Sequence, residues 1–82
     1  MFINKGIDGT NNLCGGKVAQ YRKNMGISQR QLADKLQLMG LDVDKNAIQR
    51  IEAGKRFVTD IEIVYLSSAL KVTVIDLLGL EK

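Results

Sequence analysis

The stretch from residue 28 to residue 56 constrains the fold of this chain most, because its apolar residues recur at helical spacing in two separate runs. Polar residues occupy the other faces of each run, which is the pattern of an amphipathic helix with one buried side. The pattern predicts one helix over about 29–39, a loop, and a second helix over about 45–53. The apolar residues of the two buried faces are Leu32, Ala33, Leu36 and Met39 in the first run and Ala47, Ile48 and Ile51 in the second.

Capping residues mark the ends of these two helices. Ser28 is followed three residues later by Gln31, which is the signature of a capping box at a helix N-terminus. Asp44 is a preferred N-cap residue for the second helix, and Gly54 ends it. The start and stop signals therefore agree with the apolar spacing.

The residue inventory excludes several classes of site. The chain has 82 residues, one cysteine and no histidine, so a disulfide framework, a zinc cluster and a His-based catalytic system are excluded. No apolar run reaches the roughly 20 residues that cross a bilayer, and the N-terminus lacks the pattern of a secretory signal. A lone thiol suits a reducing compartment. We therefore expect a cytoplasmic domain without a membrane segment, metal or cofactor.

The net charge of +3 is unevenly distributed along the chain. Residues 1–56 hold ten Lys or Arg against five Asp or Glu, whereas residues 57–82 hold two against four. Such asymmetry suggests a polyanion as the partner of the basic half. Taken alone, it is equally compatible with a solvated surface.

Residues 1–14 are expected to form a flexible N-terminal arm, and residues 15–82 the folded domain. The arm is polar and contains glycines, with Phe2 and Ile3 as its clear apolar anchors. Cys14 is expected to be a partly buried small residue rather than a redox sensor, because little positive charge lies near it in the sequence.

Three further helices are predicted, over about 17–25, over about 60–70, and in a short segment that ends near Gly79. The run VTVI at 72–75 alternates like a strand, but a capping threonine makes it a helix start. The predicted fold class is therefore all-α, a compact five-helix bundle. The residues that define these helices are Val18, Tyr21 and Met25 in the first, Thr59, Glu62, Ile63, Leu66, Ala69 and Leu70 in the second, and Thr73, Val74, Asp76, Leu77 and Leu78 in the third.

From Gly16 to Gly79, the segments KVAQYRKNMGISQRQLADKL, AIQRIEAGKR and YLSSALKVTVIDLL resemble, in order and spacing, the helix-turn-helix family of phage Cro and C1 repressors and their bacterial relatives. The resemblance implies a lambda-repressor-like bundle and a sequence-specific regulator of transcription, of repressor type, that binds double-stranded DNA. It also implies that the helix at 45–53 lies in the major groove.

Four polar residues of that helix are the candidates for contacting bases. The resemblance assigns Lys45, Asn46 and Arg50 to the family's base-contacting positions, with Gln49 beside them. The chemistry agrees, because Lys and Arg donate to guanine whereas Asn and Gln pair with adenine. The alternative for all four is a solvated helix face.

The resemblance assigns a second group to the DNA backbone. Gln29 matches a family position that contacts a phosphate, and helix N-termini favour anions. Arg30, Lys55 and Arg56 are expected to contact the same backbone, the alternative being solvent-exposed charge. These assignments predict a basic surface around the two helices.

Arg22 and Glu52 receive a structural role instead. The matching residues of the family form a largely buried ion pair that ties the first helix to the recognition helix. The resemblance therefore implies that these two residues hold the bundle together and do not contact DNA.

The chain departs from the family at residues 37–44, QLMGLDVD, where a typical turn between the two helices has three or four residues. We expect the earlier helix to run an extra turn and Gly40 to occupy its C-terminal cap. Leu41 and Val43 would then pack back onto the core. The exact set of base-contacting side chains depends on this loop.

A regulator of this size is expected to bind a two-fold symmetric operator as a homodimer, since one small domain contacts few base pairs. Two candidates for the dimer contact are the segment around Val74, Ile75 and Leu80 and the Phe2–Ile3 arm. The alternative function is an antitoxin or regulatory adaptor that binds a protein partner. An enzyme is not expected, because no cluster of titratable groups stands out and GTNNLCGGK lacks residues that a phosphate-binding loop requires.

Overall fold

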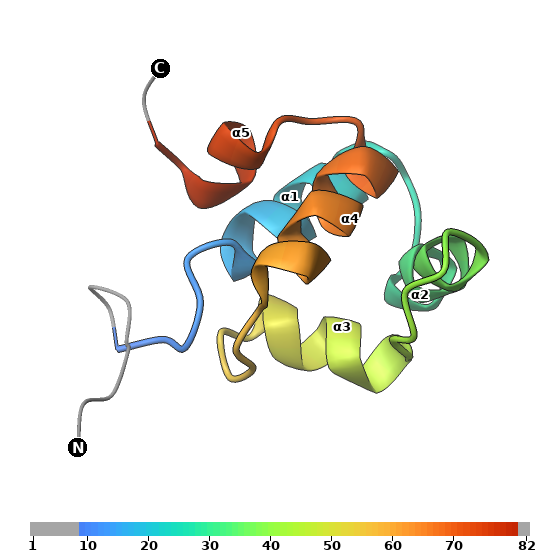
Figure 1. Ribbon diagram of the computed structural model, residues 1–82, viewed down its shortest axis with the longest axis horizontal. Coiled ribbons are helices and arrows are strands. Elements are labelled where there is room, and N and C mark those ends of the chain that lie inside the picture. Colours follow the sequence, from blue (N-terminus) through green and yellow to red (C-terminus); the bar gives the residue numbers. More distant parts are fainter. Residues whose placement is uncertain (1–8, 81–82) are drawn as a thin grey trace.

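The structure is a computed structural model that describes residues 9–80. Over these residues it contains five helices and no strand, which confirms the all-α bundle (Figure 1). The helices are α1 (Gly15–Asn24), α2 (Gln29–Leu38), α3 (Lys45–Glu52), α4 (Asp60–Leu70) and α5 (Val74–Leu78).

The helices are arranged around a central pair, α1 and α4. On one side α2 packs against both α3 and α4, and α3 also packs against α1. At the opposite end α5 packs against α1 and α4. Figure 1 shows that α3 forms one edge of the molecule, so one side of this helix faces away from the bundle.

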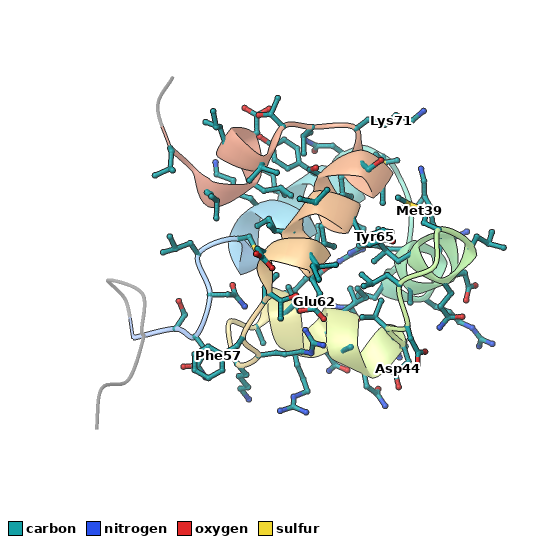
Figure 2. The ribbon with its side chains drawn as sticks, viewed as in Figure 1. Met39, Asp44, Phe57, Glu62, Tyr65 and Lys71 are labelled. Carbon is teal, nitrogen blue, oxygen red and sulfur yellow. The ribbon has the colours of Figure 1, made fainter. Side chains whose placement is uncertain are left out.

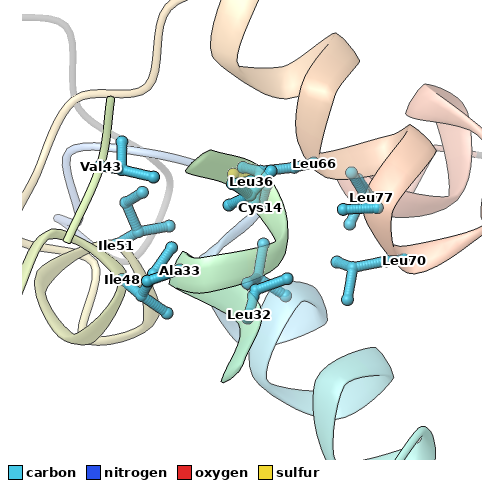
Figure 3. Close-up of a cluster of buried hydrophobic side chains, with 12 residues drawn as sticks. Cys14, Leu32, Ala33, Leu36, Val43, Ile48, Ile51, Leu66, Leu70 and Leu77 are labelled. Carbon is cyan, nitrogen blue, oxygen red and sulfur yellow. The ribbon is translucent and has the colours of Figure 1, made fainter. Parts of the chain in front are cut away.

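The core is built from the apolar faces that the sequence predicted (Figure 3). Leu32 and Leu36 of α2, and Ile48 and Ile51 of α3, are fully buried. They meet Val18 of α1 and three residues of the C-terminal helices. Those three are Leu66 and Leu70 of α4 and Leu77 of α5.

Local capping fixes where four of the helices begin. Capping boxes are formed at Ser28, Thr59 and Thr73, each with its side chain accepting from the backbone N–H three residues on. Asp44 Oδ1 accepts the N–H of Ala47 at 2.8 Å at the start of α3. The predicted helix starts at these four positions are confirmed.

The first helix differs from its prediction at both ends. It begins at Gly15 instead of residue 17, because the Asn12 side chain accepts the Gly15 N–H at 2.8 Å and extends the first turn. It ends at Asn24, one residue before the predicted end, although the Met25 N–H still bonds to the Tyr21 carbonyl at 3.1 Å. Met25 is the C-cap residue and is exposed.

The long segment between α2 and α3 closes α2 and then returns to the core. Gly40 has a φ of +102°, a left-handed conformation that favours glycine, and the Leu41 N–H bonds to the Leu36 carbonyl at 3.0 Å. Val43 is buried, Leu41 is half-buried, and Gln37 Nε2 donates to the Val43 carbonyl at 2.7 Å. The extra residues therefore pack against the bundle, as the sequence predicted.

The predicted arm, residues 1–14, lies outside the described residues as far as residue 8. From Thr10 onward the chain contacts the bundle, and Asn11 and Asn12 donate to carbonyls near the end of α3. Cys14 is 1% exposed, more deeply buried than predicted. Burial raises the pKa of its thiol to about 11, which keeps it protonated and unreactive at neutral pH.

Candidate nucleic-acid interface

The outer side of α3 carries a set of exposed polar side chains. Burial of Ile48 and Ile51 fixes the rotation of this helix about its axis. In Figure 2, Asp44 marks the N-terminal end of α3, and Phe57 lies beyond its C-terminal end. Side chains that end in nitrogen project from the outer edge of this helix. The exposed polar residues of α3 are Lys45, Asn46, Gln49 and Arg50. All four candidates for base contact therefore lie on one accessible side.

Arg22 and Glu52 form a nearly buried ion pair behind this surface. Arg22 Nε donates to Glu52 Oε2 at 2.6 Å, and Nη2 donates to Oε1 at 3.0 Å. The remaining terminal nitrogen donates to the Ile27 carbonyl at 2.9 Å. The two side chains are 11% and 8% exposed. The hydrogen bonds that Arg22 donates to Glu52 raise the pKa of Arg22, so the guanidinium stays charged inside the protein.

Gln29 joins the same network from the start of α2. Its Nε2 donates to Glu52 Oε1 at 3.0 Å, and the residue is half-buried. The sequence assigned Gln29 to a DNA phosphate without indicating this partner, which lies 23 residues away. The contact joins α2 to the end of α3, next to the backbone N–H groups that begin α2 and have no intrahelical acceptor.

The other three candidates for phosphate contact lie in different environments. Arg30 and Lys55 are exposed. The Arg56 guanidinium instead forms two hydrogen bonds to Glu62, Nη1 to Oε1 at 3.0 Å and Nη2 to Oε2 at 2.8 Å. Nη1 also donates to the Phe57 carbonyl at 3.1 Å. The Arg56 side chain is therefore bonded to the first turn of α4.

Glu62 and Asn12 are the residues of this region that the sequence did not reveal. Glu62 carried a local signal, the capping box with Thr59, but nothing in the spacing indicated Arg56 as its second partner. Asn12 lies in the predicted arm, and its partners are backbone carbonyls about 40 residues away. No sequence pattern identifies such partners, because carbonyls are common to every residue.

Two packed helices, α2 and α3, with an exposed polar side on the second, are the arrangement found in helix-turn-helix DNA-binding domains. The helix-turn-helix family model matches residues 18–77, so the chain belongs to this family, of the Cro/C1 type that its motifs resemble. No curated protein and no solved structure matches the chain. Within residues 9–80, none of the helices combines the length and apolar character required to cross a membrane.

Proposed function

We propose that this protein is a sequence-specific regulator of transcription, of repressor type, that inserts α3 into the major groove of double-stranded DNA. One observation carries the proposal: the four polar side chains of α3 are exposed together, while Ile48, Ile51 and Glu52 fix the same helix to the bundle. A rigid helix with a free polar side can present donors and acceptors to base edges without first becoming ordered.

The residues of α3 would contact bases according to their chemistry. Lys45 and Arg50 donate to guanine O6 and N7, and Asn46 or Gln49 pairs with adenine. Each good bidentate contact discriminates against a wrong base by about 1–3 kcal/mol. Asp44, the N-cap of α3, is also exposed and would disfavour a phosphate at that point.

The surfaces beside α3 would contact the DNA backbone. Arg30 and Lys55 are exposed cations on either side of the recognition helix in sequence, and the first N–H groups of α2 add a weaker attraction for anions. We assign Gln29 to this site through its backbone, since its side chain is held by Glu52. Arg56 acts chiefly by ordering the loop that carries Lys55.

The protein would bind as a homodimer on a two-fold symmetric operator, with half-sites about one helical turn, on the order of 34 Å, apart. Exposed apolar residues suitable for a dimer contact occur on α5, at Ile75, and just after it, at Leu80. Others occur on α4, at Ile61 and Val64. The second earlier candidate, the Phe2–Ile3 arm, lies outside the described residues.

Selection of bound duplexes from a random pool, followed by sequencing, tests the proposal. We expect enrichment of an approximately palindromic sequence and an affinity that falls steeply as salt concentration rises. Absence of enrichment, together with weak binding that does not depend on salt, would reject the regulator in favour of the protein-binding alternative.

A further inference from the structure

Asn12 uses every hydrogen-bonding group of its side chain to join the start of α1 to the end of α3. Its Nδ2 donates to the carbonyl oxygens of Ile51, at 3.1 Å, and Arg56, at 2.7 Å. Its Oδ1 accepts the N–H of Gly15 at 2.8 Å. No other residue type of this size offers two donors and an acceptor in this arrangement.

The neighbours of Asn12 extend this contact. The backbone N–H of Asn11 donates to the Gly54 carbonyl at 2.8 Å, and its Nδ2 donates to the Lys55 carbonyl at 3.0 Å. The Thr10 hydroxyl donates to the Asn12 carbonyl at 2.7 Å and so shapes the segment itself. We call residues 10–12 the clasp.

The approach of the clasp and α1 to α3 is close enough to require glycine at two positions. A Cβ on Gly15 would collide with the Ile51 carbonyl oxygen. A Cβ on Gly54 would lie 2.7 Å from the methyl carbon of Thr10, and Gly54 also has a φ of +75°. The clasp and the start of α1 are therefore closely packed against the C-terminal end of α3, with no space for a Cβ at either glycine.

The clasp supplies α3 with a second polar attachment to α1, in addition to the apolar packing between the two helices. The first polar attachment is the Arg22–Glu52 ion pair, and the clasp reaches α1 at Gly15, seven residues earlier. At 1.5 Å of rise per residue, the two attachments are about 10 Å apart along α1. Both hold the C-terminal end of α3, at Ile51 and Glu52, and together they resist a tilt of α3 more than the ion pair and the apolar packing alone would.

We propose that Asn12 is a positioning residue for base recognition, which acts by setting the tilt of α3 against the DNA. This inference rests on the proposed function. The clasp precedes residues 18–77, so the family match does not account for it. The clasp also binds the carbonyls of Lys55 and Arg56, and so fixes the loop that presents Lys55 to a DNA phosphate. The positions of the phosphate contact and of the base contacts of α3 are therefore set together.

The test compares affinity for the selected operator with affinity for a scrambled duplex, at a temperature where circular dichroism shows every variant folded. Asn12→Ala removes all three side-chain bonds, and Asn12→Asp keeps the acceptor while losing both donors. Asn11→Ala removes the exposed bond to the Lys55 carbonyl. Ala69→Gly, at a buried position near the C-terminal end of α4, is the matched control, since it lowers the stability of the helix without removing a bond of the clasp or an exposed apolar residue.

We expect both Asn12 variants to lose about tenfold in the operator-to-scrambled ratio, equivalent to one good base contact. Asn11→Ala should lose about threefold, and Ala69→Gly should keep the wild-type ratio although it melts earlier. Unchanged ratios in folded Asn12 variants would overturn the inference and leave the clasp a purely stabilising contact.

If neither Asn12 variant folds, the operator-to-scrambled ratio of Asn11→Ala is used instead. A lower ratio supports the inference, and an unchanged ratio overturns it. Failure of the wild-type protein to enrich any sequence would reject the proposed function together with the inference. Normal wild-type enrichment with unchanged ratios in the variants would reject the inference alone.

Discussion

Glu52 lies on the same short helix as the four exposed polar residues but faces the protein interior, where Arg22 and Gln29 both bond to it. Its carboxylate therefore stabilises the bundle and does not place a negative charge on the surface proposed to meet DNA. Residues of α3 thus have two different roles, according to the side of the helix on which they lie. Those on the outer side are exposed, and Glu52 on the inner side attaches the helix to the bundle.

Replacement of Glu52 by Ala should destabilise the protein strongly. It leaves the Arg22 guanidinium, 11% exposed, without its carboxylate, and loss of one partner of a buried pair typically costs about 3–5 kcal/mol. Thermal unfolding followed by circular dichroism should show a clearly lower Tm. Asp34→Ala, at an exposed position of α2, is the control and should change stability by at most about 0.5 kcal/mol. A wild-type Tm in Glu52→Ala would contradict the structural role.

Arg50 and Lys55 should respond differently to removal, although both are exposed cations. Arg50→Ala should relax the preference at one base position, because a base contact carries sequence information. Lys55→Ala should weaken binding to all duplexes alike and reduce the salt slope by about one, because a phosphate contact releases counterions. Affinities for a panel of single-base variants at several salt concentrations distinguish the two. An unaltered base preference in Arg50→Ala would exclude it from the base-contacting set.

At the scale of the element, the first turn of α4 joins a helix cap to an ion pair with the preceding loop. Glu62 Oε1 accepts the Thr59 N–H at 2.9 Å and Arg56 Nη1 at 3.0 Å, and Oε2 accepts Arg56 Nη2 at 2.8 Å. The hydrogen bonds from Arg56, with a smaller contribution from Thr59, lower the pKa of Glu62. Glu62 thereby holds the middle of the α3–α4 loop and the start of α4 together.

The ion pair should make stability depend on pH in the acid range. Because the pKa of Glu62 is lower in the folded protein, its contribution is complete above its ordinary pKa of about 4.5 and is lost as pH falls through the folded value. Glu62→Gln, which can still accept from Thr59, should therefore melt earlier than wild type at neutral pH. The difference should shrink as the medium is acidified. A difference that stays constant throughout the acid range would show that the charge of Glu62 contributes nothing.

At the scale of the whole molecule, the bundle has a size that suits a paired operator. Its longest extent is 36 Å, comparable with the roughly 34 Å between the half-sites of the proposed operator. α5, which carries Ile75, lies at the opposite end of the bundle from α3 (Figure 1), so a dimer contact there leaves the polar face free. The same surface would serve the alternative function, contact with a protein partner.

Half-site spacing should therefore control affinity. Insertion of about five base pairs between the half-sites rotates one by about half a turn, and we expect binding to weaken at least about tenfold. Insertion of about ten base pairs restores the rotational alignment and should recover binding only if the dimer contact tolerates the added distance. Gel-shift titration and sedimentation of the complex measure affinity and stoichiometry. An affinity indifferent to the five-base-pair insertion would mean that the protein binds each half-site as a monomer.

The elements were predictable because their signals are local. A capping box such as Ser28 with Gln31 spans three residues, and the buried faces follow from spacing along one helix. The exposure of Met25 does not follow from spacing, because burial at the end of a helix depends on where the chain goes next. The early start of α1 was missed because it depends on Asn12 and on the close approach of α3.

The sequence by itself determined the five helices, the faces they bury and the exposed polar side of α3, since these depend on periodicity and on hydrogen bonds between near neighbours. Only the tertiary structure decided which polar groups remain free. Arg56 is engaged by Glu62, Gln29 by Glu52, and Asn12 by carbonyls 39 and 44 residues away. The bonds of Gln29 and Asn12 form only after the helices have packed, because hydrogen bonding requires atoms within about 3 Å, whatever their separation along the chain. The bond of Arg56 requires the α3–α4 loop to fold back onto the start of α4.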